Sequence, residues 1–375
     1  LHEVNLTPNK SSNYYPIKPM SRIVLLNPGP VNITDKVRQA MTLPDLCHRE
    51  KEFSTLMAAI RTKLLQAFNI EKTFTSVLVS GSGTAALEMA VSSSLTPERS
   101  VLVIENGVYG ERIGKLCDIY NFHRHTIKLD WGVPPNLDNI ESILKKQSDI
   151  EIVSIVHHET TTGLLNPLQS IGELAKKYGK IFLVDCISSL AGDEVDFTSI
   201  DLAVGTANKC LQGVPGVSFV LFRKKDLARL IKIPARSLYF NLTEYHKAQD
   251  IGKSLFTPAI PAHYALDVAL DELIAETVAG RIYRYANTAK FLRDGFKKLN
   301  LEYLIPEGWR SNCLTGLKLP KGVSYEKLHG KLKANGFVIY AGQGNLSENI
   351  FRIANMGDIK KEEFDRFIKI LGTIC

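Results

Sequence analysis

The feature that most constrains the fold of this chain is an alternation of short apolar, β-branched runs with longer helical patterns between residues 21 and 270. This alternation is typical of parallel strands joined by crossover helices. Because the runs are apolar at almost every position, we expect helices on both faces of the sheet. The fold class predicted is therefore α/β, with a large, mostly parallel sheet. The clearest expected strands are 75–80, 100–106, 150–158, 180–185, 202–207 and 217–222.

The pattern changes after residue 272, where longer amphipathic segments replace the alternation. Residues 281–299 have the spacing of one long helix. We therefore predict a large domain over 21–272 and a smaller C-terminal α+β domain over 273–375. The start of the large domain is also compatible with joining the small one. Short strands of the small domain are expected near 313–319, 336–340 and 349–355.

Residues 1–20 are predicted to form an N-terminal tail or linker, because they are polar, contain proline and lack periodicity. The sequence begins with Leu1 rather than Met. This start fits a linker to an upstream domain of a longer polypeptide and a processed terminus equally well.

The composition favours a protein that acts on small molecules in the cytoplasm. The 46 Lys and Arg against 39 Asp and Glu give a net charge of +7, but the basic residues are scattered, which argues against nucleic acid. No apolar run has membrane-spanning length, and the first twenty residues lack the apolar centre of a secretory signal. The six cysteines are far apart and form no CxxC pair, which favours a reducing compartment over a disulfide framework or structural metal.

The first candidate for chemistry is the segment GSGT at 81–84, where an expected strand runs directly into a helix. Ligands of an open α/β sheet bind beyond the carboxyl ends of its strands. Small residues let backbone N–H groups close around an anion, and a helix N-terminus adds positive potential. Ser82, Gly83 and Thr84 therefore predict a phosphate seat, although a plain tight turn has the same pattern.

The same segment also matches the dinucleotide pattern GxGxxA, and Glu105 ends the next expected strand. An acidic residue at that place would bind a ribose hydroxyl. An NAD(P)-dependent dehydrogenase is therefore a rival interpretation. This interpretation gives no role to Asp185 and Lys209, which follow two later strands.

Asp185 and Lys209 each follow an apolar strand. Asp185 fits either a helix cap or an anion held against the ring N–H⁺ of a cofactor. Lysine side chains usually place the ammonium in water, but Lys209 stands among small and apolar neighbours in TANKCLQGVPG. Such a place can desolvate the amine, lower its pKa and suit it to forming a Schiff base.

The fourth candidate is VHHETTTGLLNP, a further strand end that is rich in hydroxyl groups. These hydroxyls suit a phenolic or carbonyl oxygen. His157 and His158 are adjacent, and neighbours on a strand point to opposite faces, so they do not readily share one ion. We therefore expect no metal.

Taken in order, these segments resemble the class V, fold-type I pyridoxal-phosphate aminotransferase family. The resemblance covers nearly the whole chain after Arg22. Any single motif is modest support, whereas the ordered set is highly specific. The segments that carry it are LLNPGPVN (25–32), GSGTAALE (81–88), ENGVYGER (105–112), HETTTGLLNP (158–167), VDCISSLAG (184–192), TANKCLQGVPG (206–216), LFTPAIPAH (255–263), GFVIYAG and FRIANMG (351–357).

The resemblance implies that pyridoxal 5′-phosphate is the cofactor and assigns residues to its ring. Lys209 would carry the cofactor covalently and move the proton between the substrate carbon and the C4′ carbon. Asp185 would pair with the ring nitrogen. Tyr109 would stack on the ring, and Thr160 would hydrogen-bond its 3′-oxygen.

It also implies how the phosphate is held. Ser82, Gly83 and Thr84 would bind it from one subunit, and Thr257 would reach the same phosphate from a neighbouring subunit. The active site would then be completed within a homodimer at least.

For the substrate, the resemblance implies that Arg352 binds the acidic end while the turn containing Asn27 and Gly29 closes the pocket. A guanidinium suits a carboxylate or a phosphonate. The resemblance is strongest to the members of the family that exchange 2-aminoethylphosphonate and pyruvate for phosphonoacetaldehyde and L-alanine. Transamination between alanine or serine and glyoxylate is the close alternative.

Overall fold

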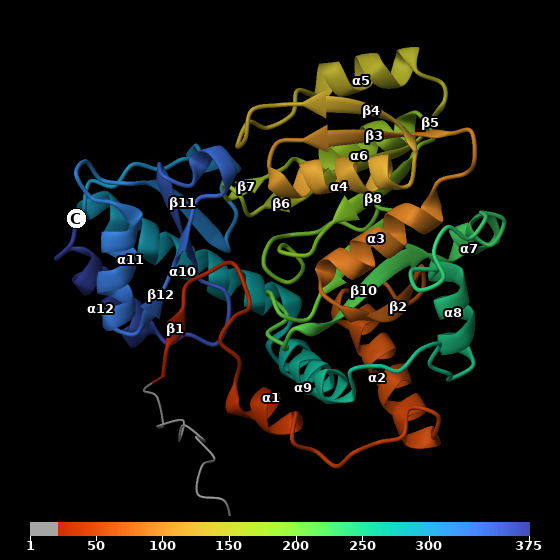
Figure 1. Ribbon diagram of the computed structural model, residues 1–375, viewed down its shortest axis with the longest axis horizontal. Helices are drawn as coiled ribbons and strands as arrows, with labels where there is room; N and C mark the ends of the chain where they lie inside the picture. The colour runs from red at the N-terminus through yellow and green to blue at the C-terminus, as the bar shows by residue number, and fades with distance from the viewer. Residues whose placement is uncertain (1–21) are drawn as a thin grey trace, which may run out of the picture.

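The computed structural model describes residues 22–375, so the predicted tail over 1–20 lies outside the described residues. The described chain forms two units (Figure 1). The larger one surrounds a seven-stranded sheet, and the smaller one is built mainly from the C-terminal residues. No helix within 22–375 is long and apolar enough to cross a bilayer.

The seven strands follow the order β2, β10, β9, β8, β5, β3, β4. The neighbouring strands from β9 to β4 pair in parallel, whereas β10 pairs antiparallel with both β2 and β9. The mostly parallel sheet predicted from the sequence is confirmed. The strands are β2 (Phe74–Gly81), β3 (Ser100–Glu105), β4 (His123–Lys128), β5 (Ile150–Val156), β8 (Ile181–Asp185), β9 (Leu202–Thr206) and β10 (Gly216–Arg223).

Helices cover both faces of this sheet, as the uniformly apolar strands indicated. On β10, Phe219 and Leu221 belong to one buried cluster, whereas Val220 and Phe222 belong to another on the opposite face. The helices of the large unit are α1 (Asp35–Ala40), α2 (Lys51–Ala67), α3 (Gly83–Ser94), α4 (Val108–Ile119), α5 (Leu137–Lys146), α6 (Leu168–Lys177), α7 (Leu227–Leu230), α8 (Leu242–Asp250) and α9 (Ile260–Glu276).

The smaller unit contains a three-stranded antiparallel sheet in the order β11, β14, β13, together with three helices. The N-terminal strand β1 (Val24–Leu25) pairs in parallel with β12 (Phe337–Val338). The start of the described chain therefore packs against the C-terminal part of the chain. The other elements are β11 (Leu314–Lys318), β13 (Tyr340–Ala341), β14 (Ile350–Ala354), α10 (Val278–Lys298), α11 (Tyr325–Ala334) and α12 (Lys361–Leu371).

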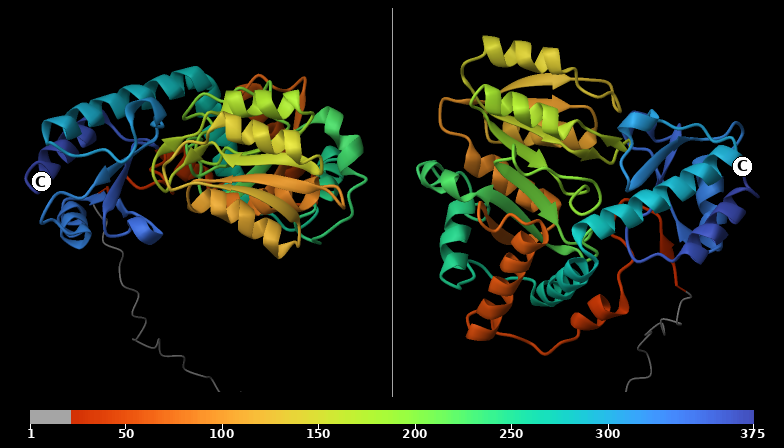
Figure 2. Two further views of the ribbon diagram at one scale, coloured as in Figure 1. Left: turned by 90° about the horizontal axis from the view of Figure 1, so that it is seen from above. Right: turned by 180° about the vertical axis from the view of Figure 1, so that it is seen from behind.

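Helix α10 connects the two units, and in Figure 2 it extends from the large unit along the small one. Arg281 Nη1 donates to the carbonyl oxygen of Cys210 at 2.8 Å. The Tyr285 hydroxyl accepts from the side chain of Gln212 at 2.7 Å and from the amide of Gly357 at 3.0 Å. Two buried side chains of this helix therefore contact both the β9–β10 loop and a loop of the small unit.

A side chain of α8 protects part of the outer edge of β2. Gln249 of α8 is buried, its Oε1 accepts from the amide of Leu78 at 3.0 Å, and its Nε2 donates to the carbonyl of Leu78 at 2.6 Å. An edge strand whose backbone groups are unpaired is a site for unwanted pairing. Gln249 thus satisfies a donor and an acceptor that the sheet leaves open.

Replacing Gln249 by Ala is expected to lower the free energy of unfolding by about 1–3 kcal/mol, because two buried backbone groups lose their partner. The matched control is Gln169→Ala on the exposed face of α6, for which we expect a change within about 0.5 kcal/mol. Urea denaturation of the two variants measures both values. Equal stabilities would show that β2 does not need this contact.

Candidate active site

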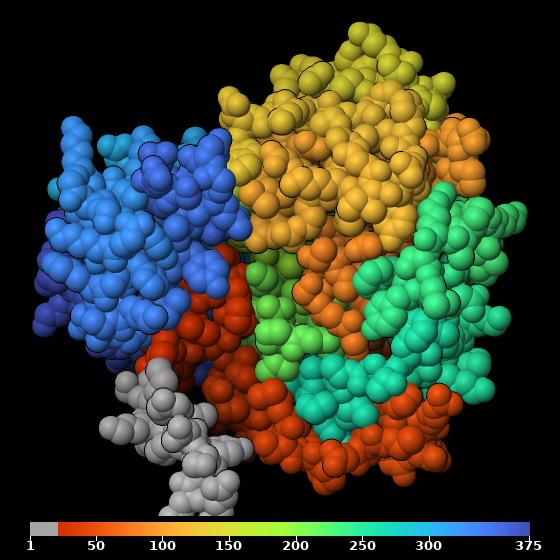
Figure 3. Space-filling model, viewed as in Figure 1, coloured from red at the N-terminus to blue at the C-terminus, as the bar shows by residue number. Residues whose placement is uncertain are grey.

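A cavity of about 180 Å³ lies beyond the carboxyl ends of the parallel strands. In Figure 3 the surface is hollowed between the small unit and the large one, and residues from the middle of the chain, drawn in green, lie at the base of the hollow. The cavity is lined by Ser82, Gly83, Thr84, Tyr109, Arg112, Val156, His158, Thr160, Asp185, Ile187, Ser188, Thr206, Asn208 and Lys209.

The structure therefore brings together residues predicted from five separate segments. Strand alternation selects which of them face the cavity: Val156, His158 and Thr160 line it, while the residues between them point elsewhere. The alternation also explains the adjacent histidines. His158 Nδ1 lies 3.1 Å from the carbonyl oxygen of Ser188, and burial lowers the pKa of His157 to about 3. Both rings are buried.

Asp185 ends β8 and Lys209 follows β9, and both side chains line the cavity. Burial raises the pKa of Asp185 to about 6 and lowers the pKa of Lys209 to about 8. One carboxylate oxygen of Asp185 accepts from the amide of Ile187 at 2.9 Å, which is the local cap that the sequence allowed. Within 22–375, neither charge forms an ion pair. A bound ligand could therefore place a cationic group against the Asp185 carboxylate and an electrophilic carbon within reach of the Lys209 amine.

The segment 82–84 begins α3, as the phosphate interpretation requires. Ser82 is the N-cap, and its side chain makes no capping hydrogen bond. A Cβ atom at Gly83 would lie 2.6 Å from Cδ1 of Ile187, so a larger residue would displace the cavity wall. The Thr84 hydroxyl accepts from Arg112 at 3.0 Å, which leaves its proton free to donate to an anion.

The N-terminal turn contacts the lysine directly. Lys209 Nζ donates to the carbonyl oxygen of Pro28. Gly29 has φ of +107°, and a Cβ atom there would lie 2.7 Å from Nζ of Lys209. Asn27 is buried, and its amide nitrogen donates to the carbonyl of Pro30 at 3.0 Å. The turn predicted to close the pocket therefore packs against the amine.

Arg352 lies on β14 and is 2% exposed. Its Nε donates to the carbonyl of Ala341 at 2.8 Å, and its Nη1 donates to the carbonyl of Thr160 at 2.8 Å. Thr160 lines the cavity, so this contact holds the guanidinium next to a lining residue, although Arg352 itself does not line the cavity. Thr257, in contrast, is exposed and does not line the cavity of its own chain.

Two residues near the cavity were not identified from the sequence. Arg112 lines the cavity, and its guanidinium carbon lies 4.6 Å from the centroid of the Tyr109 ring. Its place inside the segment ENGVYGER, shortly after a strand end, is the signal that could have drawn attention to it.

Glu159 is the second, and it is fully buried. One carboxylate oxygen accepts from the amides of Tyr109 at 3.1 Å and Gly110 at 3.2 Å, and the other accepts from the amide and hydroxyl of Thr161 at 3.0 and 2.5 Å. Burial raises the pKa of Glu159, and these four donors oppose that shift. The carboxylate therefore caps the N-terminus of α4 and fixes the backbone that carries Tyr109.

The dinucleotide interpretation is wrong. Glu105 does not face the cavity; its carboxylate pairs with Arg124 of β4 at 2.9 Å. The GSGT segment follows β2, an edge strand whose sheet neighbour is the antiparallel β10. A dinucleotide motif requires instead a parallel βαβ unit at the centre of the sheet.

Comparison with known proteins identifies the family. The pattern of the class-V aminotransferases matches residues 36–348. The chain belongs to the class-V aminotransferases. A protein of Bacillus cereus named 2-aminoethylphosphonate--pyruvate transaminase is 35% identical over 352 residues, which cover 92% of this chain and 96% of the relative.

Solved structures agree in fold. An alanine--glyoxylate aminotransferase from Nostoc sp. superposes with a TM-score of 0.90 at 27% identity, covering 99% of this chain and all of the other. A pyridoxamine-pyruvate aminotransferase from Mesorhizobium loti has a TM-score of 0.88 at 26% identity, covering 95% of this chain and 92% of the other. The chain is thus an aminotransferase, and pyridoxal phosphate is its cofactor. The buried carboxylate, the buried amine and the helix N-terminus described above fit that group.

Replacing Glu159 by Gln is expected to loosen the segment that carries Tyr109, because an amide nitrogen cannot accept hydrogen bonds and would face N–H donors. We expect a loss of about 1–3 kcal/mol in the free energy of unfolding and weaker retention of the cofactor. Urea denaturation and titration of the apoprotein with cofactor, followed by absorbance, measure the two effects. Glu173→Gln on the exposed surface of α6 is the control, and matching values in both variants would contradict the role.

Proposed function

We propose that this aminotransferase exchanges 2-aminoethylphosphonate and pyruvate for phosphonoacetaldehyde and L-alanine. The observation that carries the proposal is the buried guanidinium of Arg352, which donates to the carbonyl of Thr160, a residue that lines the cavity together with Lys209. A guanidinium binds a phosphonate and a carboxylate in the same two-pronged way, so one residue serves both substrates in turn. The identity of the amino donor rests on the relatives named for it at 35% identity.

The chain's own groups account for the proton transfer. When bound, the cofactor supplies an electron sink for the carbon that carries the amino group. Lys209 would hold it covalently, and the pKa of about 8 means that its amine is partly neutral near neutral pH and can accept a proton at Nζ. Asp185 would hold the ring N–H⁺. That positive charge would favour the charged carboxylate of Asp185, whereas burial alone favours the neutral carboxyl group.

Tyr109 and Thr160 would orient the ring. The Tyr109 backbone is fixed by Glu159, and its ring is covered on one side by Arg112. An aromatic face held in this way suits stacking on a flat group. The Thr160 hydroxyl would bind the 3′-oxygen, and Asn27 and Gly29 would exclude water from the amine.

We also propose that the active site is completed in a homodimer. Ser82, Gly83 and Thr84 would hold the cofactor phosphate, and Thr257 would reach it from the neighbouring subunit. Thr257 is exposed, and the adjacent Phe256 stacks on Tyr239 with ring centroids 4.9 Å apart. Next to Tyr239, Leu238 is 86% exposed. An apolar surface beside a phosphate-binding threonine is what such an interface would bury.

Two broader assignments remain proposals. The division into domains over 21–272 and 273–375 is supported by the separate core of the small unit, to which Val24 and Leu26 of the N-terminal segment also belong. A cytoplasmic location is supported by cysteine usage that suits a reducing compartment.

The alternative within the family is transamination between alanine or serine and glyoxylate. The likeness to the Nostoc enzyme, named for alanine and glyoxylate, supports it at 27% identity. Assays with each amino donor against pyruvate and glyoxylate distinguish the two. Rapid turnover of glyoxylate without any turnover of the phosphonate would replace our proposal by this alternative.

Removing the amine of Lys209 tests the catalytic assignment. Lys209→Ala is expected to abolish turnover of 2-aminoethylphosphonate and the visible absorbance of the covalently held cofactor, with the fold retained. Arg352→Ala should keep that absorbance and lower kcat/KM by about 10- to 100-fold, because it loses charge-assisted contacts to substrate. Retained turnover in Lys209→Ala, or loss of absorbance in Arg352→Ala, would contradict the roles of the two residues.

Mixing two inactive variants tests the shared site. Thr257→Asp places a negative charge against the cofactor phosphate of the partner and should be inactive, as should Lys209→Ala. A mixed dimer has one complete site, with Lys209 from one chain and Thr257 from the other. Random reassortment of equal amounts should therefore restore about a quarter of wild-type activity. No recovery after mixing, with mixed dimers demonstrated, would place Thr257 outside the partner's site.

A further inference from the structure

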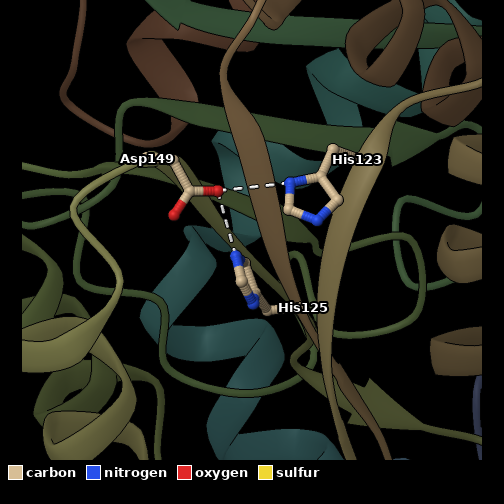
Figure 4. Close-up of side chains that lie close together, drawn as sticks. All are labelled: His123, His125 and Asp149. Carbon is tan, nitrogen blue, oxygen red and sulfur yellow. Dashed lines mark hydrogen bonds and ion pairs between the residues drawn. The ribbon is translucent and has the colours of Figure 1, made fainter.

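A second group of chemically competent side chains lies at the amino ends of the strands, away from the cavity. His123 and His125 stand two residues apart on β4, so their rings are on the same face of the strand. Asp149 precedes β5 and lies opposite them (Figure 4). Its Oδ2 is 3.2 Å from Nδ1 of His123 and 3.0 Å from Nε2 of His125. Three groups that bind metal ions therefore converge on one point.

The backbone holds these groups in place. In the sheet register Ser100 of β3 pairs with His123, and the Ser100 amide donates to the carbonyl of Asp149 at 3.1 Å. The ligand atoms of the three side chains all lie within 4.8 Å of one another. Ligands carried by a strand and by a loop fixed to the next strand are preorganised, so little ordering is needed on binding.

The cationic side chains near this group have other hydrogen-bond or ion-pair partners. Arg124, between the two histidines, points to the other face of β4 and pairs with Glu105 and Asp118. Cations that flank Asp149 donate to backbone carbonyls: Arg99 to Ser148 at 3.1 Å, and Lys180 to Ile150 at 2.6 Å. The approach to the three ligands is open, since the His123 side chain is 69% exposed.

We propose that His123, His125 and Asp149 form a binding site for a divalent transition-metal ion, with Zn²⁺ as the ion that suits them best. Two imidazole nitrogens and one carboxylate oxygen are ligands that Zn²⁺ accepts in a tetrahedral site, with water as the fourth. Mg²⁺ and Ca²⁺ prefer oxygen ligands alone. A simple ion pair would need only one of the two rings.

The position of the site defines its effect. His123 is the first residue of β4, at the amino ends of the strands, whereas the cavity lies beyond their carboxyl ends. A bound ion would join the edge strand β4 to the loop before β5. It therefore stabilises the sheet edge and leaves the transamination site unchanged.

The test uses the holoenzyme in a Cys47→Ser, Cys375→Ser background, which removes the two exposed thiols as competing ligands. Equilibrium dialysis against ZnCl₂ should give one more bound zinc ion per chain than the same protein holds before zinc is added. His125→Ala and Asp149→Asn should each weaken zinc binding by about tenfold or more. Removing a residue that only hydrogen-bonds to a metal ligand already costs about that much affinity, and removing the ligand itself should cost no less. The control, His329→Ala on α11, should bind like the parent.

Thermal unfolding supplies the second readout. Zn²⁺ should raise the Tm of the parent and of His329→Ala but not that of His125→Ala, while turnover stays the same in all three after excess metal is removed. Retained turnover also shows that each variant is folded. Equal zinc binding in the parent and in His125→Ala would overturn the proposal, as would zinc that binds and abolishes turnover.

Discussion

The candidate active site depends on two opposite charges that are buried beside one cavity without pairing. Asp185 and Lys209 sit at neighbouring strand ends, and neither forms an ion pair with another described residue. Burial alone favours the neutral form of each, with pKa values of about 6 and 8. Burying two such groups away from water costs folding free energy, and the apolar clusters on the two faces of the sheet offset that cost. A ligand that gives each group a partner removes the penalty, which is why the site favours binding.

Segments that are distant in the sequence converge on Lys209. The turn at Pro28 accepts its hydrogen bond, and Arg281 of α10 holds the carbonyl of the next residue, Cys210. Arg352 donates to the carbonyl of Thr160, a residue that lines the same cavity. Helix α10 and the N-terminal segment therefore contact the loop that carries the amine, although the strands that precede Asp185 and Lys209 lie in the large unit. Substitutions in α10 are expected to act on the site through this loop.

Much of the fold could be predicted because the strands are buried on both faces, and their uniform apolar character is visible in the sequence. The strand β4 was missed because the edge strand HRHTIK exposes polar residues and carries little of that signal. The antiparallel direction of β10 was also not foreseen, since an apolar run does not report its direction. Strand-end residues such as Asp185 could be located, whereas Glu159 reads as one more polar residue in HETTTG. Its function arises from contacts with Tyr109 and Gly110, about 50 residues away.

In the proposed reaction, the charges around the cavity would let one site hold two anions at once. The cofactor phosphate and the acidic end of the substrate repel each other, so each needs its own positive group. Arg112 is tied to the Thr84 hydroxyl at the phosphate seat, while Arg352 is tied to a backbone carbonyl on the opposite unit. Burial lowers the pKa of Arg352 and raises the pKa of Asp185. The negative charge of Glu159 opposes the first shift and adds to the second. Because these groups share one electrostatic field, a change to Glu159 would alter substrate binding and cofactor binding together.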